Sequence, residues 1–107
     1  NDLMRPAMYG AHHDIIAVDE APDGTDDWAY HVVGAVCESS DVFRRNMLLR
    51  PLKEGDLVAI RSAGAYGASM SNTYNTRPLI PEVLVEGDSF RIIRKRGTYA
   101  EMLSVYG

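Results

Sequence analysis

Short apolar and β-branched runs, each closed by a cluster of turn-forming residues, limit most strongly how this chain folds. The runs lie at 9–18, 30–37, 57–61, 82–85 and 90–96, with Gly, Pro, Asp or Asn residues between them. Such short runs are typical of β-strands, whereas an amphipathic helix needs a longer stretch with a period of 3.6 residues. The sequence therefore predicts a mainly β domain of about six short strands in one sheet or barrel.

The C-terminal third contains the two most definite local patterns. Gly87, between the last two runs, predicts a β-hairpin whose turn uses a positive φ. Thr98 followed three residues later by Glu101 is typical of a capping box and predicts a short terminal helix. The apolar stripe of this helix is expected to contain Met102, Leu103 and Tyr106.

Other stretches show neither the two-residue alternation of a strand nor the 3.6-residue period of a helix, and they are predicted as loops. They are the acidic segment 19–27, the segment 43–51, the glycine-flanked segment 64–67 and the polar segment 68–77. The last segment has room for one helical turn. This turn would end before Pro78, because proline ends a helix.

Composition narrows the class of protein. With 107 residues, 46% hydrophobic content and a net charge of −4, the chain has the size and apolar content of one ordered domain. The acidic balance disfavours a nucleic-acid partner, and no apolar run reaches the roughly 18–20 residues of a membrane span. Cys37 is the only cysteine, so no internal disulfide forms. These features, with no secretory signal at the start, predict a cytoplasmic protein.

Three clusters contain side chains suited to chemistry: residues 5–9, 37–41 and 64–67. An arginine binds a carboxylate through two parallel hydrogen bonds, and a thiol with a pKa near 8.5 holds a proton at neutral pH but releases it readily. Each residue also has a structural interpretation. Arg5 fits a surface cation, Tyr9 a half-buried aromatic, Cys37 an inert core residue, Glu38 a solvated turn residue and Tyr66 an apolar plug at a turn.

The order and spacing of these clusters resemble the C-terminal domain of a known family, the fold-type III, pyridoxal-phosphate-dependent decarboxylases of ornithine, diaminopimelate and arginine. The resemblance runs through NDLMRPAMYG, CESSD, GAYGASM, RPLIPEVLV and RIIRKRGTYAEML, and so covers nearly the whole chain. It implies a Greek-key-like β-barrel or sandwich over residues 1–107, similar to the C-terminal domain of alanine racemase. The catalytic (β/α)₈ barrel of the family is absent from this sequence, so we expect a fragment.

The resemblance also implies a role for five residues. Arg5 and Tyr9 match residues that hold the substrate carboxylate, and Glu38 matches the residue that meets the far amino group. Cys37 matches a cysteine that donates a proton after carbon dioxide leaves. Tyr66 matches a tyrosine beside the cofactor and its phosphate.

The implied substrate is meso-diaminopimelate, converted to L-lysine and carbon dioxide, because relatives in the polyamine pathway tend to have Asp where this chain has Glu38. Neither Lys53 nor Lys95 matches the lysine that carries pyridoxal phosphate, so this lysine is expected outside the chain. The family also implies a homodimer with shared active sites. The chain alone is expected to be inactive.

Two alternatives remain open at this point. One is a sister decarboxylase acting on ornithine, arginine or carboxynorspermidine, and the other is a non-catalytic binding or assembly module. A metal site at residues 12–14 is disfavoured, because adjacent histidines on a strand point to opposite faces and no further ligand has a suitable spacing.

Overall fold

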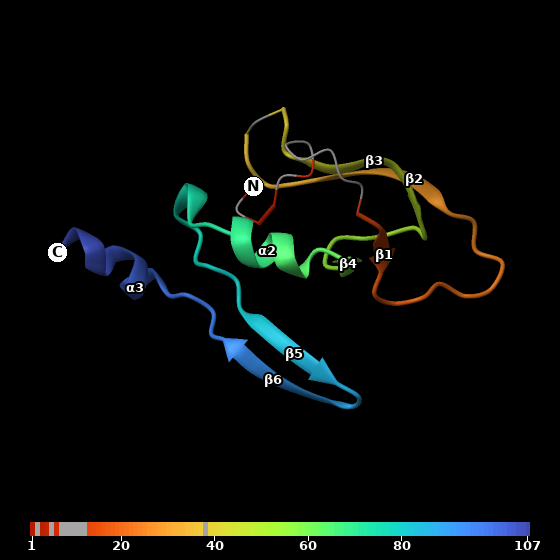
Figure 1. Ribbon diagram of the computed structural model, residues 1–107. Helices are drawn as coiled ribbons and strands as arrows, with labels where there is room; N and C mark the ends of the chain where they lie inside the picture. The colour runs from red at the N-terminus through yellow and green to blue at the C-terminus, as the bar shows by residue number, and fades with distance from the viewer. Residues whose placement is uncertain (2, 5, 7–12, 38) are drawn as a thin grey trace. The chain divides into compact units, whose positions relative to one another are not determined.

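The structure is a computed structural model that describes residues 1, 3, 4, 6, 13–37 and 39–107. Contacts divide the chain into two compact units, one formed by Arg5–Ala65 and the other by Asn1–Met4 together with Tyr66–Gly107. Six short strands lie in the described part of the chain (Figure 1). The prediction of a mainly β chain is therefore confirmed.

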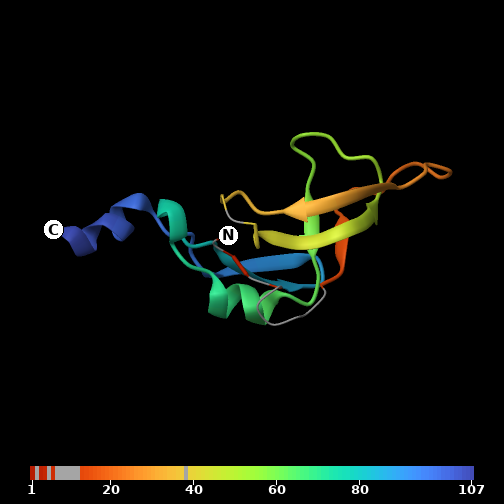
Figure 2. The same cartoon turned by 90° about the horizontal axis from the view of Figure 1, so that it is seen from above.

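The Arg5–Ala65 unit contains two antiparallel ladders (Figure 2). They join β1 (Ile15–Ala17) to β4 (Val58–Ile60) and β2 (Trp28–Val33) to β3 (Val42–Leu49). β1 also contacts β3. Ile15 is fully buried and Leu49 nearly so, which places the small apolar core of this unit on β1 and β3.

β3 is irregular, which explains why residues 43–51 were predicted, wrongly, as a loop. Its register against β2 shifts twice, between Tyr30 and Val32 and again between Val32 and Val33. Asn46 has a φ of 53° inside the strand, and its backbone N–H donates to Nδ1 of His31 at 3.2 Å. These bulges break the alternation of apolar and polar residues by which a strand is recognised.

The second unit contains the predicted hairpin. β5 (Glu82–Glu86) pairs with β6 (Ser89–Arg94), and Gly87 in the turn has a φ of 56°. This prediction is confirmed, because Glu86 pairs with Ser89 across a two-residue turn whose first residue has the positive φ that favoured hairpin turns use. The far end is closed by a hydrogen bond of 2.9 Å from the Gly97 N–H to the Leu79 carbonyl.

Helices flank the hairpin in sequence. α2 (Gly64–Met70) occupies the segment predicted as a glycine-flanked loop, so this prediction was wrong. Gly67 is buried, and a Cβ there would lie 3.8 Å from Cδ1 of Leu3. The helix backbone at Gly67 therefore lies close to the Leu3 side chain. A 3₁₀ turn follows at Tyr74–Thr76, where one helical turn was expected.

The capping box of α3 (Tyr99–Leu103) is confirmed. The Thr98 hydroxyl accepts from the Glu101 N–H at 3.1 Å, and the Glu101 carboxylate accepts from the Thr98 N–H at 3.0 Å. The expected apolar stripe is not a buried one, since Leu103 and Tyr106 are exposed. The cap alone therefore explains where this short helix begins.

In the described residues the six strands form three two-stranded ladders without a closed barrel. The mainly β class is thus confirmed, and the arrangement of the strands in one barrel or sandwich stays a prediction. The helices found in the same part of the chain are all too short to cross a bilayer.

Candidate functional site

The structure describes two of the five predicted site residues. Cys37 belongs to the Arg5–Ala65 unit and Tyr66 to the other, and each is described within its own unit. Arg5, Tyr9 and Glu38 lie outside the described residues. The convergence of all five on one surface therefore stays a prediction.

Cys37 lies in the eight-residue connection from Gly34 to Asp41, between β2 and β3. The predicted strand 30–37 ends earlier, at Val33, so the cysteine lies in a bend beyond the ladder. Its side chain is exposed, which does not fit an inert core cysteine. An exposed thiol on a loop held by a two-stranded ladder is accessible to a ligand.

Asp41 organises this connection, a role that the sequence analysis missed. Its carboxylate Oδ2 accepts from the Val36 N–H at 2.9 Å, and its carbonyl accepts from the Gly34 N–H at 2.9 Å. Its residue exposure is only 4%. The available signal was the aspartate that closes the turn, because short acidic side chains bond back to nearby backbone N–H groups.

Gly34 makes room for this arrangement. A Cβ at position 34 would overlap the Asp41 carboxylate, and the φ of Gly34 is not positive. Glycine is therefore needed here for space, not for backbone conformation.

Tyr66 lies on α2, not on a loop as expected. Its side chain remains partly exposed, at 39%, so the ring is not a fully buried plug. The next segment is anchored locally. Asn72 donates from Nδ2 to the Met70 carbonyl at 3.0 Å and accepts from the Tyr74 N–H at 2.9 Å.

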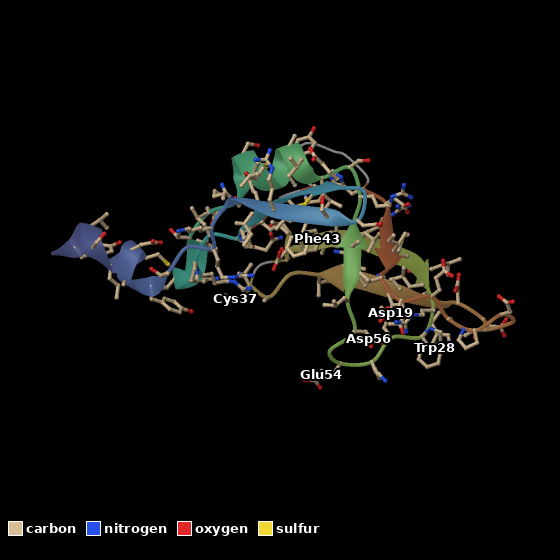
Figure 3. All side chains as sticks on the ribbon, turned by 90° about the horizontal axis from the view of Figure 1, so that it is seen from below. Asp19, Trp28, Cys37, Phe43, Glu54 and Asp56 are labelled. Atoms are coloured by element: carbon tan, nitrogen blue, oxygen red, sulfur yellow. The ribbon has the colours of Figure 1, made fainter. Side chains whose placement is uncertain are left out.

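A surface pocket of about 490 Å³ lies at the opposite end of the β2–β3 ladder from Cys37, among Asp19, Trp28 and Asp56 (Figure 3). Arg50 makes several polar contacts in it. Arg50 donates to the carbonyls of Asp19 and Pro51 and pairs with the Asp56 carboxylate at 3.3 Å. These bonds fasten the acidic segment 19–27 to the turn before β4. We call the contacts of Arg50 with Asp19, Pro51 and Asp56 the Asp56 clamp.

Electrostatics support this structural interpretation. The Lys53 N–H donates to Asp56 Oδ2 at 3.0 Å, and with the Arg50 guanidinium it holds the pKa of Asp56 below its ordinary value of 3.8, despite an opposing effect of desolvation. Nearby, the Leu52 N–H donates to the phenol oxygen of Tyr30 at 2.8 Å. These bonds connect the turn to β2.

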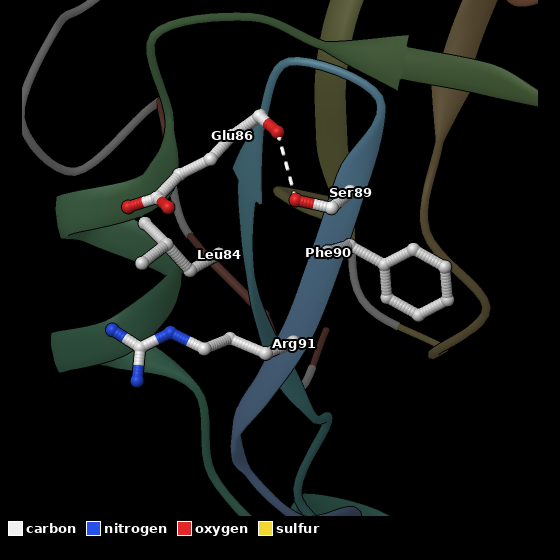
Figure 4. Close-up of a pocket in the computed structure, with 5 residues that line it drawn as sticks. All are labelled: Leu84, Glu86, Ser89, Phe90 and Arg91. Atoms are coloured by element: carbon white, nitrogen blue, oxygen red, sulfur yellow. Dashed lines mark hydrogen bonds between the residues drawn. The ribbon is translucent and has the colours of Figure 1, made fainter.

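A second pocket, on the β5–β6 hairpin, has a volume of only about 80 Å³ (Figure 4). Leu84, Glu86 and Arg91 project from one face of the hairpin and Phe90 from the other, while Ser89 Oγ donates to the Glu86 carbonyl at 3.0 Å. Ligand pockets usually measure about 300–1,000 Å³. This hollow is too small for an amino-acid substrate and its cofactor.

The described residues contain no group of three histidine, cysteine or acidic side chains close enough to hold a metal ion. His13 is buried, and its Nδ1 lies 3.3 Å from the Arg61 carbonyl oxygen. Both lysines of the chain, Lys53 and Lys95, are exposed. Neither has the enclosed setting that a covalent pyridoxal phosphate site requires.

Comparison with known proteins adds independent evidence. Residues 1–64 match the family of pyridoxal-dependent decarboxylases at their C-terminal sheet domain. A diaminopimelate decarboxylase from Streptomyces coelicolor is 50% identical, over 97% of this chain and 26% of that protein. One from Zymomonas mobilis is 45% identical, over 96% of this chain and 24% of that protein.

A solved structure of an enzyme with the same name is also similar to this chain. The crystal structure of diaminopimelate decarboxylase from M. jannaschii in co-complex with L-lysine has a TM-score of 0.86 and 41% identity, over 97% of this chain and 23% of that one. The chain spans about a quarter of the length of the relatives it matches.

Proposed function

Since the chain belongs to the family of pyridoxal-dependent decarboxylases, we propose that it acts as the C-terminal domain of a diaminopimelate decarboxylase, which converts meso-2,6-diaminopimelate to L-lysine and carbon dioxide. One observation carries this proposal: identity of 45–50% to proteins of that name over nearly all of the chain. The lysine bound in the M. jannaschii enzyme is consistent with it, because lysine is the product of this reaction.

Within this function, Cys37 donates the proton that replaces the departed carboxyl group on the substrate carbon. Its exposure on the connection between β2 and β3 supports this role, because a thiol that is accessible to the substrate can act as a general acid. Arg5 and Tyr9 bind the substrate carboxylate, and Glu38 binds the distal ammonium group. These pairings match opposite charges and hydrogen-bond donors to acceptors.

The cofactor of the family fits this chain only in part. When bound, pyridoxal phosphate takes up the electron pair left by carbon dioxide. The exposed ring of Tyr66 is suited to contact it, but the exposed Lys53 and Lys95 are not suited to anchor it. We therefore assign the anchoring lysine to a (β/α)₈ barrel domain that forms the rest of the enzyme.

The wider assembly follows from the same assignment. The three ladders become part of a Greek-key-like barrel in the intact enzyme, since each ladder has only two strands in the part of the chain that the structure describes, and open strand edges pair readily with further strands. The enzyme acts in the cytoplasm as a homodimer, with each active site drawing residues from both subunits.

A substrate panel tests the proposal. The intact protein that contains this chain, supplied with pyridoxal phosphate, is incubated separately with meso-diaminopimelate, L-ornithine, L-arginine and carboxynorspermidine, and carbon dioxide release is measured. We expect turnover of meso-diaminopimelate with formation of L-lysine and far lower kcat/KM for the others. A higher kcat/KM for another substrate would assign the chain to a sister enzyme, and no turnover of any would favour a binding module.

A further inference from the structure

Asp41, the last residue of the connection that contains Cys37, binds two residues near the start of that connection. Asp41 accepts the Gly34 N–H with its carbonyl and the Val36 N–H with its carboxylate, both at 2.9 Å. The first bond closes the β2–β3 ladder, whereas the second reaches into the connection and ends at the residue directly before Cys37. The carboxylate therefore acts on the part of the loop that sets the direction of the thiol.

The burial of Asp41 indicates that this contact is built into the fold. Aspartate is rarely buried unless it has a partner, and this one, with an exposure of only 4%, accepts the Val36 N–H. Gly34 has no side chain, so the Asp41 carboxylate can lie against its Cα. A Cβ at position 34 would overlap this carboxylate.

We propose that Asp41 is a positioning residue for the decarboxylation, holding the backbone at Val36 so that the Cys37 thiol meets the substrate carbon. This inference rests on the proposed function of Cys37 as the proton donor. Asp41 does not touch the substrate. Its effect passes through the backbone N–H of Val36 to the next residue.

Asp56 provides a matched control. Its carboxylate also accepts a nearby backbone N–H, from Lys53 at 3.0 Å, in the connection that follows β3. It lies at the end of the β2–β3 ladder opposite Cys37 (Figure 3). Loss of this bond disturbs a turn of the same kind without touching the loop of the cysteine.

A double-mutant cycle in the intact holoenzyme tests the inference, with kcat and KM for meso-diaminopimelate as readouts. Asp41→Ala should lower kcat by about 10- to 100-fold with little change in KM, as expected for a displaced catalytic group. Asp41→Asn, which keeps an oxygen acceptor, should retain more activity. In a Cys37→Ala background, Asp41→Ala should cause almost no further loss, and Asp56→Asn should leave kcat near the wild-type value.

The outcomes separate the two proposals. If Cys37→Ala lowers kcat but Asp41→Ala does not, or if the two losses multiply, the positioning role is wrong and the function of Cys37 stands. If Cys37→Ala leaves kcat unchanged, the proton-donor role fails and the inference fails with it. If Asp41→Ala does not fold, Asp41→Asn carries the same cycle, and multiplicative losses there overturn the inference.

Discussion

The carboxylate of Asp41 occupies the space that any side chain larger than hydrogen at position 34 would fill. Gly34→Ala should therefore push Asp41 away and lower the free energy of unfolding by about 1–3 kcal/mol, the usual range for overpacking. Urea unfolding followed by the fluorescence of Trp28, the only tryptophan, measures the change.

Gly64→Ala is the control for this substitution. A Cβ at position 64 meets open space at the start of α2. The stability of this variant should equal or slightly exceed that of the wild type, because alanine favours a helix. Equal stability of Gly34→Ala and the wild type would contradict the close approach of Asp41.

The Asp56 clamp should make stability depend on pH in a defined direction. The pKa of Asp56 is lowered in the folded state, so the clamp contributes fully above the ordinary value of 3.8 and is lost as pH falls through the lowered value. The stability difference between wild type and Asp56→Asn should therefore be largest near neutral pH and shrink in acid.

Urea unfolding between pH 7 and pH 2.5 measures this difference. Glu54→Gln is the control, since Glu54 is an exposed acid of the same turn (Figure 3). Its stability difference from the wild type should stay small throughout. A difference for Asp56→Asn that grows as pH falls would contradict the direction of the pKa change.

The capping box predicts a local effect at the C-terminus. Thr98→Ala removes the hydroxyl that accepts the Glu101 N–H and should weaken α3 by about 1 kcal/mol. Faster hydrogen exchange at the Glu101 and Met102 amides reports this loss. Thr73→Ala is the comparison, because the Thr73 side chain makes no capping bond at the following 3₁₀ turn, and exchange there should not change.

One face of the β5–β6 hairpin is apolar and exposed. It consists of Val83, Val85, Phe90 and Ile92, which are paired across the two strands. An isolated two-stranded hairpin with such a face is marginally stable in water, so this chain alone should self-associate as its concentration rises.

Sedimentation velocity tests this expectation. Phe90→Ser should reduce the rise of the sedimentation coefficient with concentration, whereas Arg91→Ser, on the opposite face, should not (Figure 4). A sedimentation coefficient of the wild type that stays at the monomer value throughout would contradict the prediction.

The elements that were predictable from sequence are those determined by neighbours in the chain. The Gly87 turn requires a positive φ, and Thr98 and Glu101 satisfy each other's backbone within one helical turn. The residues of the turn and of the capping box therefore predict these two elements without any contact to distant parts of the chain. β3 was missed because its bulges and the left-handed Asn46 remove the strand period.

Contacts between distant residues explain the remaining differences. α2 contains two glycines and has low helix propensity, yet Gly67 is buried near Leu3, which no local pattern reveals. Similarly, the turn residues of segment 37–41 were recognised, but the bond from Val36 to Asp41 depends on how the connection folds back. The pairing of strands into three ladders is also a long-range property.

With the proposed function, this domain completes a decarboxylase active site by supplying Cys37. In the intact enzyme, Cys37→Ala and a variant without the cofactor-anchoring lysine should each be nearly inactive alone. We expect Cys37 to serve the site of the partner subunit, as the resemblance to the family implies, whereas Arg5, close to the start of the chain, serves its own.

Activity after subunits are mixed is the most direct measurement of this claim. Heterodimers of the Cys37→Ala and lysine variants should recover lysine formation, since one of their two sites combines an intact cysteine with an intact lysine. Heterodimers of Arg5→Ala and the lysine variant should recover none, because they contain no intact site. Recovery in both mixtures, or in neither, would contradict the account.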